Sequence, residues 1–306
     1  MVRIKMLRLL CVLLLLSAGR AFAGKVDTLK LHSDVMNRDI PVVVITPERK
    51  GAAKDVRYPV VYLLHGAYGN ERSWLEIKPQ LPDIADEKGM IFVSMAALNS
   101  WYFDSPVLKD FQYETFYTRT LVPWVDAHYN TVSSREGRAI TGLSMGGHGA
   151  LFLAMRHKDM FGACGSMSGG VDIRPFPQNW NIPDVLGEMS ANKQSWDEHT
   201  VVGQLGRIKN GDLRITFDCG ESDFFLEVNK DLHKRLLGLG IDHDFTTRPG
   251  GHTSQYWANS IDYHLLFFEK FFRQSGTFVE MQWRAAKASK MVKGVKNVNG
   301  LKTKKR

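Results

Sequence analysis

The chain has 306 residues, of which 44% are hydrophobic and 24% charged, so it is long and apolar enough to bury one sizeable core. Its formal net charge of +8 comes from its two ends, because residues 1–23 and 285–306 hold 12 of the 40 basic residues and no acidic one. The other 28 basic residues stand against 32 acidic ones, so the body carries about −4, which argues against a nucleic-acid-binding surface.

Residues 1–23 indicate a cleavable export signal. Three basic residues precede an apolar run, 9–16, that is too short to cross a bilayer, and Ala-Phe-Ala at 21–23 is typical of a cleavage site. The mature protein is therefore expected in the periplasm or outside the cell, without a transmembrane segment. The basic tail, 285–306, is poor in large apolar residues and is predicted to be disordered.

Between these ends, 24–284 is expected to form a single α/β domain. Two strands joined by a short turn predict a hairpin, and the later strands alternate with helices, which predicts a mostly parallel sheet with helices on both faces. The eight expected strands are 26–31, 38–45, 60–64, 90–95, 138–143, 163–168, 213–219 and 242–248. The expected helices are 81–88, 110–129, 146–157, 224–237 and 254–272.

The third strand ends in His65-Gly66-Ala67, at the expected carboxyl edge of the sheet. The backbone N–H of Ala67 can face a nucleophile on a neighbouring strand, so we predict that it is one donor of an oxyanion hole. His65 is expected to support this loop rather than to act as a base.

The fourth strand leads to an aromatic loop, 99–106, at the same edge. Adjacent rings on such a loop can form a wall against a flat or apolar acyl group, so Trp101 and Tyr102 are predicted to bind substrate. Phe224 and Trp74 are further candidates of this kind. The alternative for each ring is a place in the core.

The most informative motif is the pentapeptide G-L-S-M-G at 142–146. A short strand precedes it and an apolar helical segment follows it, and this strand–turn–helix setting exposes a serine hydroxyl above the end of a parallel sheet. The two glycines keep side chains out of a crowded turn. We therefore predict that Ser144 is a nucleophile and that the N–H of Met145 is the second oxyanion donor.

Residues 169–211 interrupt the alternation of strands and helices. They hold three prolines and two tryptophans, and they begin at the carboxyl end of a strand. We expect a cap-like insertion that contacts the active site, with a surface excursion as the alternative.

The acid of such a site is expected on the loop after the strand at 213–219. Asp223 lies in that loop, whereas Asp218 falls inside the strand and Glu221 directly follows the glycine after it. Asp223 is preferred for its place in the loop. The other two carboxylates remain alternatives.

The base is expected on the loop after the last strand. His252 follows this strand and a Pro-Gly-Gly turn, a setting that none of the other nine histidines has. Loops at the carboxyl ends of parallel strands meet at one edge of a sheet. Ser144, Asp223 and His252 are therefore predicted to form a Ser-His-Asp triad, in the chain order typical of α/β-hydrolases.

Together these motifs resemble the esterase D-like group of α/β-hydrolases, which includes S-formylglutathione hydrolases, tributyrin-type esterases, feruloyl and acetylxylan esterases, and mycolyltransferases. The resemblance extends from about residue 31 to 272 and is carried by the stretches 62–66, 100–106, 138–147, 219–224 and 250–257. It implies an α/β-hydrolase fold with a mostly parallel eight-stranded sheet. By the same resemblance, the nucleophile, acid, base and oxyanion donors are Ser144, Asp223, His252, Ala67 and Met145.

Two segments depart from the pattern of this group. Residues 118–120 are Thr-Arg-Thr where the resemblance predicts an acidic residue, and residues 157–159 are His-Lys-Asp where His-Pro-Asp is usual. Neither segment belongs to the predicted triad, so they bear on the subgroup rather than on the chemistry.

The sequence therefore predicts an exported serine carboxylesterase that works through an acyl-enzyme and needs no metal or organic cofactor. Its expected substrates are small esters, or acyl and feruloyl esters on plant polysaccharide. The export signal argues against S-formylglutathione, whose metabolism is cytoplasmic in the family. The alternatives are an acyltransferase that passes the acyl group to a sugar hydroxyl, and a binding protein on a retained hydrolase fold. The acyl chain and the oligomeric state are left open.

Overall fold

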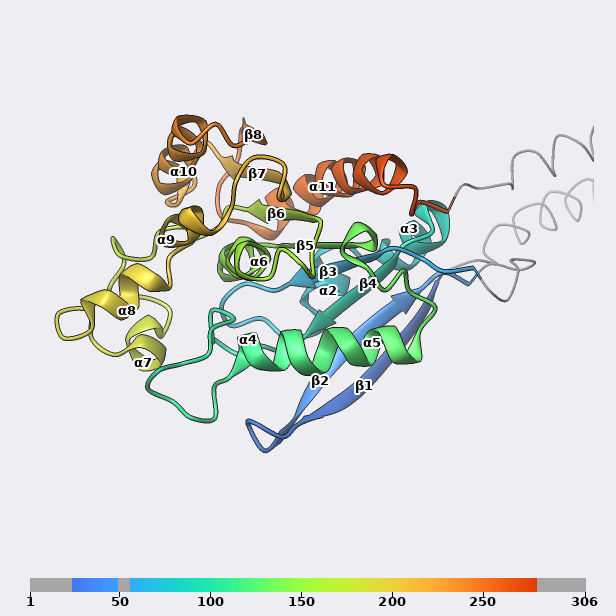
Figure 1. The fold of residues 1–306 in the computed structure, drawn as a ribbon, viewed down its shortest axis with the longest axis horizontal. Coiled ribbons are helices and arrows are strands. Elements are labelled where there is room, and N and C mark those ends of the chain that lie inside the picture. Colours follow the sequence, from blue (N-terminus) through green and yellow to red (C-terminus); the bar gives the residue numbers. More distant parts are fainter. Residues whose placement is uncertain (1–23, 49–55, 280–306) are drawn as a thin grey trace, which may run out of the picture.

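A computed structural model describes residues 24–48 and 56–279, which build one eight-stranded sheet in the order β1-β2-β4-β3-β5-β6-β7-β8 (Figure 1). The strands are β1 (Lys25–Ser33), β2 (Arg38–Thr46), β3 (Val60–Leu64), β4 (Ile91–Met95), β5 (Arg138–Gly142), β6 (Ala163–Met167), β7 (Arg214–Gly220) and β8 (His243–Arg248). β2 is antiparallel to both β1 and β4, and the other pairings are parallel. The expected α/β-hydrolase sheet is confirmed, with strand bounds within two residues of those predicted.

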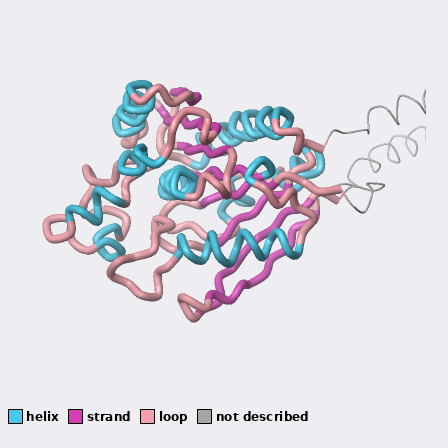
Figure 2. Tube along the Cα trace, in the orientation of Figure 1, coloured by secondary structure: helices cyan, strands magenta, loops and turns pink. Residues whose placement is uncertain are grey.

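Helices cover both faces of this sheet, as the tube in Figure 2 shows. They are α2 (Ser73–Ile77), α3 (Leu81–Lys88), α4 (Tyr113–Phe116), α5 (Val122–His128), α6 (Met145–Arg156), α7 (Ile182–Leu186), α8 (Lys193–Glu198), α9 (Val201–Gln204), α10 (Leu226–Gly238) and α11 (Ser254–Gln274). Because both faces are covered, the four central strands are buried along their whole length, and their sequences show no regular alternation of apolar and polar residues.

The two faces pack into separate cores. On β3, Val60, Tyr62 and Leu64 pack in the core that takes side chains from α4, α5, α6 and α10. Val61 and Leu63 point to the opposite face and pack with side chains from α2, α3 and α11. This alternation follows from the two-residue period of a strand.

The helix expected over 110–129 is interrupted by a π turn, Tyr117–Leu121, between α4 and α5. Pro123 lies in the first turn of α5 and has no backbone N–H, so the regular ladder of hydrogen bonds cannot continue through it. The N–H of Val122 instead bonds to the carbonyl of Tyr117, five residues back. The Thr-Arg-Thr departure at 118–120 falls within this π turn.

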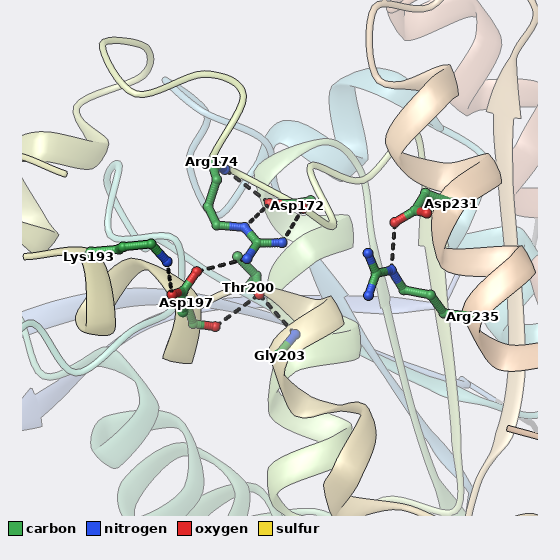
Figure 3. Close-up of polar contacts among 8 residues, drawn as sticks. All are labelled: Asp172, Arg174, Lys193, Asp197, Thr200, Gly203, Asp231 and Arg235. Atoms are coloured by element: carbon green, nitrogen blue, oxygen red, sulfur yellow. Dashed lines mark hydrogen bonds and ion pairs between the residues drawn. The ribbon is translucent and has the colours of Figure 1, made fainter. Parts of the chain in front are cut away.

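The insertion 169–211 is folded and carries α7, α8 and α9, which the sequence did not predict. Arg174 ties its first residues to α8, because the guanidinium donates to both carboxylate oxygens of Asp172, at 2.7 and 2.9 Å, and to Asp197 at 2.8 Å (Figure 3). Thr200 caps α9 by accepting a 2.9 Å hydrogen bond from the N–H of Gly203. These contacts make the insertion a built part of the domain.

The expectations for the two ends fall outside the described residues: the export signal at 1–23 and the basic tail at 285–306. Within 24–48 and 56–279, no helix has the length and apolarity that a membrane span requires. The two cysteines in these ranges, Cys164 and Cys219, are both buried and unpaired.

Candidate active site

Ser144, Asp223 and His252 come together at the carboxyl edge of the sheet, as predicted. Ser144 lies between β5 and α6, Asp223 follows β7, and His252 lies between β8 and α11. His252 Nε2 is 2.9 Å from Ser144 Oγ, and His252 Nδ1 is 2.8 Å from Asp223 Oδ2. Three loops thus bring a hydroxyl, an imidazole and a carboxylate into one hydrogen-bonded line.

The nucleophile elbow holds Ser144 in a strained conformation with φ 55° and ψ −120°. Such a conformation costs free energy and persists only where the surroundings enforce it. Both flanking glycines are enforced by close packing: a Cβ on Gly142 would lie 2.4 Å from the carbonyl oxygen of Gly146, and one on Gly146 would lie 2.4 Å from that of Leu64. The pentapeptide therefore needs glycine at both positions for steric reasons.

The hydrogen-bonded line has the geometry that base catalysis requires. Asp223 is buried and ionised carboxylates only accept, so His252 Nδ1–H donates to Asp223 Oδ2. The lone pair of Nε2 then faces the hydroxyl of Ser144. The other oxygen, Asp223 Oδ1, accepts a 2.9 Å hydrogen bond from the N–H of Phe225, which fixes the carboxylate.

The structure separates Asp223 from the two rival acids. Asp218 is buried elsewhere, where it accepts hydrogen bonds from Tyr256, Ser260 and His264 rather than from His252. Glu221 is exposed on the loop. The carboxylate on the imidazole is that of Asp223.

The two predicted oxyanion donors flank Ser144. Ala67 lines the same hollow as Ser144. Met145 is the first residue of α6, where backbone N–H groups have no acceptor within the helix and the helix dipole favours negative charge. Both N–H groups therefore remain candidates for binding an oxyanion.

His65 supports the loop that carries Ala67, as expected. Its ring is fully buried, its Nδ1–H donates to the carbonyl of Gly66 at 2.7 Å, and its Nε2 accepts from the N–H of Ala97 at 2.8 Å. Burial lowers the pKa of His65 to about 4, so the ring is neutral near pH 7. A neutral ring is what these two opposite hydrogen bonds require.

The buried histidines predict a loss of stability in mild acid. Burial lowers the pKa of His148 to about 3, as it lowers that of His65 to about 4, whereas the unfolded rings titrate near 6.5. The unfolded chain therefore binds more protons below pH 6.5, so this stabilisation is fully present above pH 6.5 and is lost as the pH falls. Each ring changes the free energy of unfolding by at most about 1.4 kcal/mol per pH unit. The urea concentration at the midpoint of unfolding should fall as the pH is lowered from 6.5 to 4.5, and it should fall less steeply in His148→Asn. A midpoint that does not change over this pH range would contradict the prediction.

Ser144 and His252 open into a hollow of about 310 Å³. Side chains from several segments line it: Tyr68, Ile77, Trp180 and Trp257. Trp180 belongs to the insertion, so the predicted contact between the insertion and the site is present. Phe224 is 51% exposed, with its ring stacked on Trp180 at 5.6 Å and 4.3 Å from the ring of His252.

Two of the predicted substrate-binding rings lie elsewhere. Trp101 and Tyr102 are 1% and 0% exposed and belong to the core, so the prediction that they form an open wall of the site is wrong. Both have a positive φ, 54° and 63°, and this local backbone conformation gives their rings directions that a sequence pattern does not reveal. Tyr102 donates to the carbonyl of His65, and Trp101 donates to that of Trp180, so they support the site from behind.

Trp74 is also a core residue, 1% exposed, and its indole donates to the carbonyl of Leu64 at 3.0 Å. The rings that do line the hollow, those of Tyr68, Trp180 and Trp257, were not predicted from the sequence. A signal was present for two of them, because Tyr68 directly follows the oxyanion loop and Trp180 lies in the insertion. Among the described residues, no cluster of three or more histidine, cysteine or acidic side chains could hold a metal ion.

Comparisons with known proteins agree with this geometry. Residues 33–268 match the family model Esterase. A solved ferulic acid esterase is 31% identical and superimposes with a TM-score of 0.72, covering 82% of this chain and all of its own. The diacylglycerol acyltransferase/mycolyltransferase Ag85B of Mycolicibacterium smegmatis is 31% identical over 276 residues, which cover 77% of this chain and 82% of its own.

Esterase Rv1288 of Mycobacterium tuberculosis is 28% identical over 224 residues, which cover 64% of this chain. The match covers 48% of that relative, so the chain spans about half the length of this mycobacterial protein.

Proposed function

Because the chain belongs to the Esterase family, we propose that it is an exported serine carboxylesterase. The observation that carries this proposal is the line of hydrogen bonds from Ser144 through His252 to Asp223, at 2.9 and 2.8 Å. A hydroxyl within reach of an oriented base is the arrangement that acyl transfer to serine requires. Export is supported by the signal pattern of residues 1–23.

The reaction follows from the positions of these groups. His252 Nε2 takes the proton of Ser144 as Oγ attacks the ester carbonyl carbon, and Asp223 stabilises the imidazolium that forms. The N–H groups of Ala67 and Met145 receive the negative charge on the carbonyl oxygen. His252 then gives its proton to the departing alcohol oxygen. Water attacks the acyl-enzyme by the same route, and the acid is released.

The hollow beside Ser144 favours substrates with a flat acyl group. Trp180 and Trp257 line it, and the ring of Phe224 stacks on that of Trp180, so an aromatic acyl group has more than one ring to contact. Small acyl groups also fit a hollow of about 310 Å³. Together with the similarity to a ferulic acid esterase, this supports acyl or feruloyl esters of plant polysaccharide as the natural substrates.

The proposal is tested with a panel of p-nitrophenyl esters from acetate upward, together with methyl ferulate and acetylated xylan. Turnover of at least one class, blocked by a fluorophosphonate that labels Ser144, is the expected result. A folded protein that hydrolyses none of these esters would overturn the proposed function.

The similarity to a mycolyltransferase favours one alternative, in which a sugar hydroxyl replaces water as the acyl acceptor. The two activities share every step up to the acyl-enzyme. Adding glucose or trehalose to the ester assay separates them. An esterase releases free acid at an unchanged rate, whereas an acyltransferase forms the sugar ester at the expense of the acid.

Trp180, from the insertion, is expected to affect the specificity for the acyl group. Trp180→Ala removes a ring from the hollow, so kcat/KM for methyl ferulate should fall about tenfold, which corresponds to about 1.4 kcal/mol. The value for p-nitrophenyl acetate should change less than threefold, because an acetyl group is too short to need this ring. Trp196→Phe is the matched control, since Trp196 is a buried insertion residue whose indole donates to the carbonyl of Gly187. Equal losses for both esters would show that Trp180 does not contact the acyl group.

A further inference from the structure

A second cluster of polar side chains surrounds Asp218, the carboxylate that the triad does not use. Asp218 is 2% exposed. Its Oδ1 accepts a 3.0 Å hydrogen bond from the hydroxyl of Tyr256, and its Oδ2 accepts from Ser260 and, at 3.0 Å, from His264 Nε2. Arg248 Nη1 lies 3.1 Å from the same oxygen. Three hydrogen-bond donors and one guanidinium at ion-pair distance thus converge on one buried carboxylate.

His264 extends this cluster to the strand before the nucleophile. Its Nδ1 lies 2.8 Å from Thr141 Oγ1 on β5. Gly165 on the neighbouring strand makes room for the ring, because a Cβ there would lie 2.5 Å from His264 Nδ1. Thr141 and His264 are 0% and 1% exposed. A substrate cannot reach this hydroxyl, so the cluster is not a second catalytic site.

The cluster joins the strands that lead into the three triad loops: Thr141 is on β5, Asp218 on β7 and Arg248 on β8. They precede the serine, acid and histidine of the triad by three, five and four residues respectively. The remaining members, Tyr256, Ser260 and His264, lie on α11, which begins two residues after His252. The cluster around one carboxylate therefore connects the three strands that precede Ser144, Asp223 and His252.

Asp218 is held in its charged form. Burial opposes the charge, but the hydrogen bonds from His264 and Ser260 outweigh it and keep the pKa of Asp218 below its ordinary value. A buried charge whose donors come from several elements has a low free energy in one arrangement only, because any displacement leaves it unpaired.

We propose that Asp218 is a positioning residue that fixes the serine, acid and histidine loops relative to one another. It acts through Thr141, His264 and Arg248 and does not touch substrate. The proposal rests on the proposed function of the triad. Its physical basis is that a displacement of about 1 Å between reacting groups can cost about a hundredfold in rate.

The test is Asp218→Asn, which removes the charge and keeps the shape. The number of active sites is first titrated with a fluorophosphonate, so that unfolded protein does not count. We expect kcat per titrated site for p-nitrophenyl acetate to fall at least about tenfold, with KM changed by less than about threefold. A loss confined to kcat indicates misplaced catalytic groups rather than a damaged substrate hollow.

Glu114→Gln is the matched control. Glu114 is also a buried carboxylate, 6% exposed, and it accepts hydrogen bonds from Arg156 and His157 at 2.7 Å. These partners lie at the far end of α6 and just beyond it, away from the triad loops. This variant should lose thermal stability as Asp218→Asn does and keep kcat per titrated site within about twofold.

Thr141→Val removes one contact of the cluster with little change of volume, and it decides the question if Asp218→Asn does not fold. We expect its kcat per titrated site to fall about threefold to tenfold. Combined with Asp218→Asn, the loss should be smaller than the product of the two single losses, because both act through one connection. Wild-type kcat in Thr141→Val, or equal kcat in Asp218→Asn and Glu114→Gln, would overturn the positioning role. Full turnover in Ser144→Ala would instead overturn the proposed function.

Discussion

Replacing Ser144 with alanine is expected to lower kcat for p-nitrophenyl acetate by a factor of about 10⁴ or more. Alanine removes the Oγ that lies 2.9 Å from His252 Nε2, so no acyl-enzyme can form. The oxyanion donors and the hollow stay in place, which leaves only the residual catalysis that a water molecule can supply. KM should change little, because the hydroxyl contributes little to ground-state binding. Steady-state hydrolysis, with the melting temperature measured in parallel, checks this result.

Ser195→Ala is the control for this prediction. Ser195 is a partly buried serine on α8 in the insertion. Its replacement with alanine should leave kcat within about twofold of the wild-type value. Ser144→Ala also separates an enzyme from a binding protein on a retained hydrolase fold. A binding protein would show no ester turnover in the wild type and unchanged ligand binding in Ser144→Ala. More than a tenth of wild-type turnover in Ser144→Ala would show that the nucleophile lies elsewhere.

The sheet and the grouping of Ser144, Asp223 and His252 could be predicted from the sequence because both depend on local patterns. Central strands such as β3 are continuous apolar runs, which short turns and helices separate clearly. The pentapeptide at 142–146 predicts a tight turn, because a Cβ at Gly142 or Gly146 would clash with neighbouring backbone atoms. Because β5, β7 and β8 lie parallel in one sheet, their carboxyl ends lie at one edge. The proximity of the loops that follow them could therefore be predicted from the strand pattern alone.

The walls of the site could not be predicted because they depend on tertiary contacts and on unusual backbone angles. Trp101 and Tyr102 occupy the left-handed region, where the direction of a ring does not follow from the sequence around it. Trp180 reaches the hollow from the insertion, whose first residues Arg174 ties to α8 through Asp172 and Asp197. A hydrophobicity pattern carries no record of such contacts.

The Asp218 cluster was missed for a related reason. Its members are spread over 124 positions, from Thr141 to His264, and each alone is an ordinary strand or helix residue. From the sequence alone, Asp218 was only an alternative to Asp223 as the acid. In the structure its position inside β7, which argued against that role, is what lets it contact α11 and β8 together.

Asp223→Asn should reduce kcat/KM at neutral pH by about 10⁴-fold while leaving the fold intact. The asparagine side chain has nearly the same shape, but its NH₂ group can donate to His252 Nδ1, which lies 2.8 Å from the present carboxylate. The neutral imidazole would then carry its proton on Nε2 and present a donor to Ser144 instead of a lone pair. The imidazolium would also lose the carboxylate that stabilises it.

Glu221→Gln distinguishes this effect from a general loss of negative charge on the loop. Glu221 is exposed and two residues from Asp223, so its replacement should change kcat/KM by less than about twofold. Asp223→Asn should also keep the melting temperature closer to that of the wild type than Asp218→Asn does. Asp223 loses one strong partner, whereas Asp218 holds three hydrogen-bond donors and an ion pair with Arg248. The two aspartates thus give opposite rankings, with Asp223 affecting rate most and Asp218 affecting stability most. A small effect of Asp223→Asn on rate would show that the carboxylate only supports the loop.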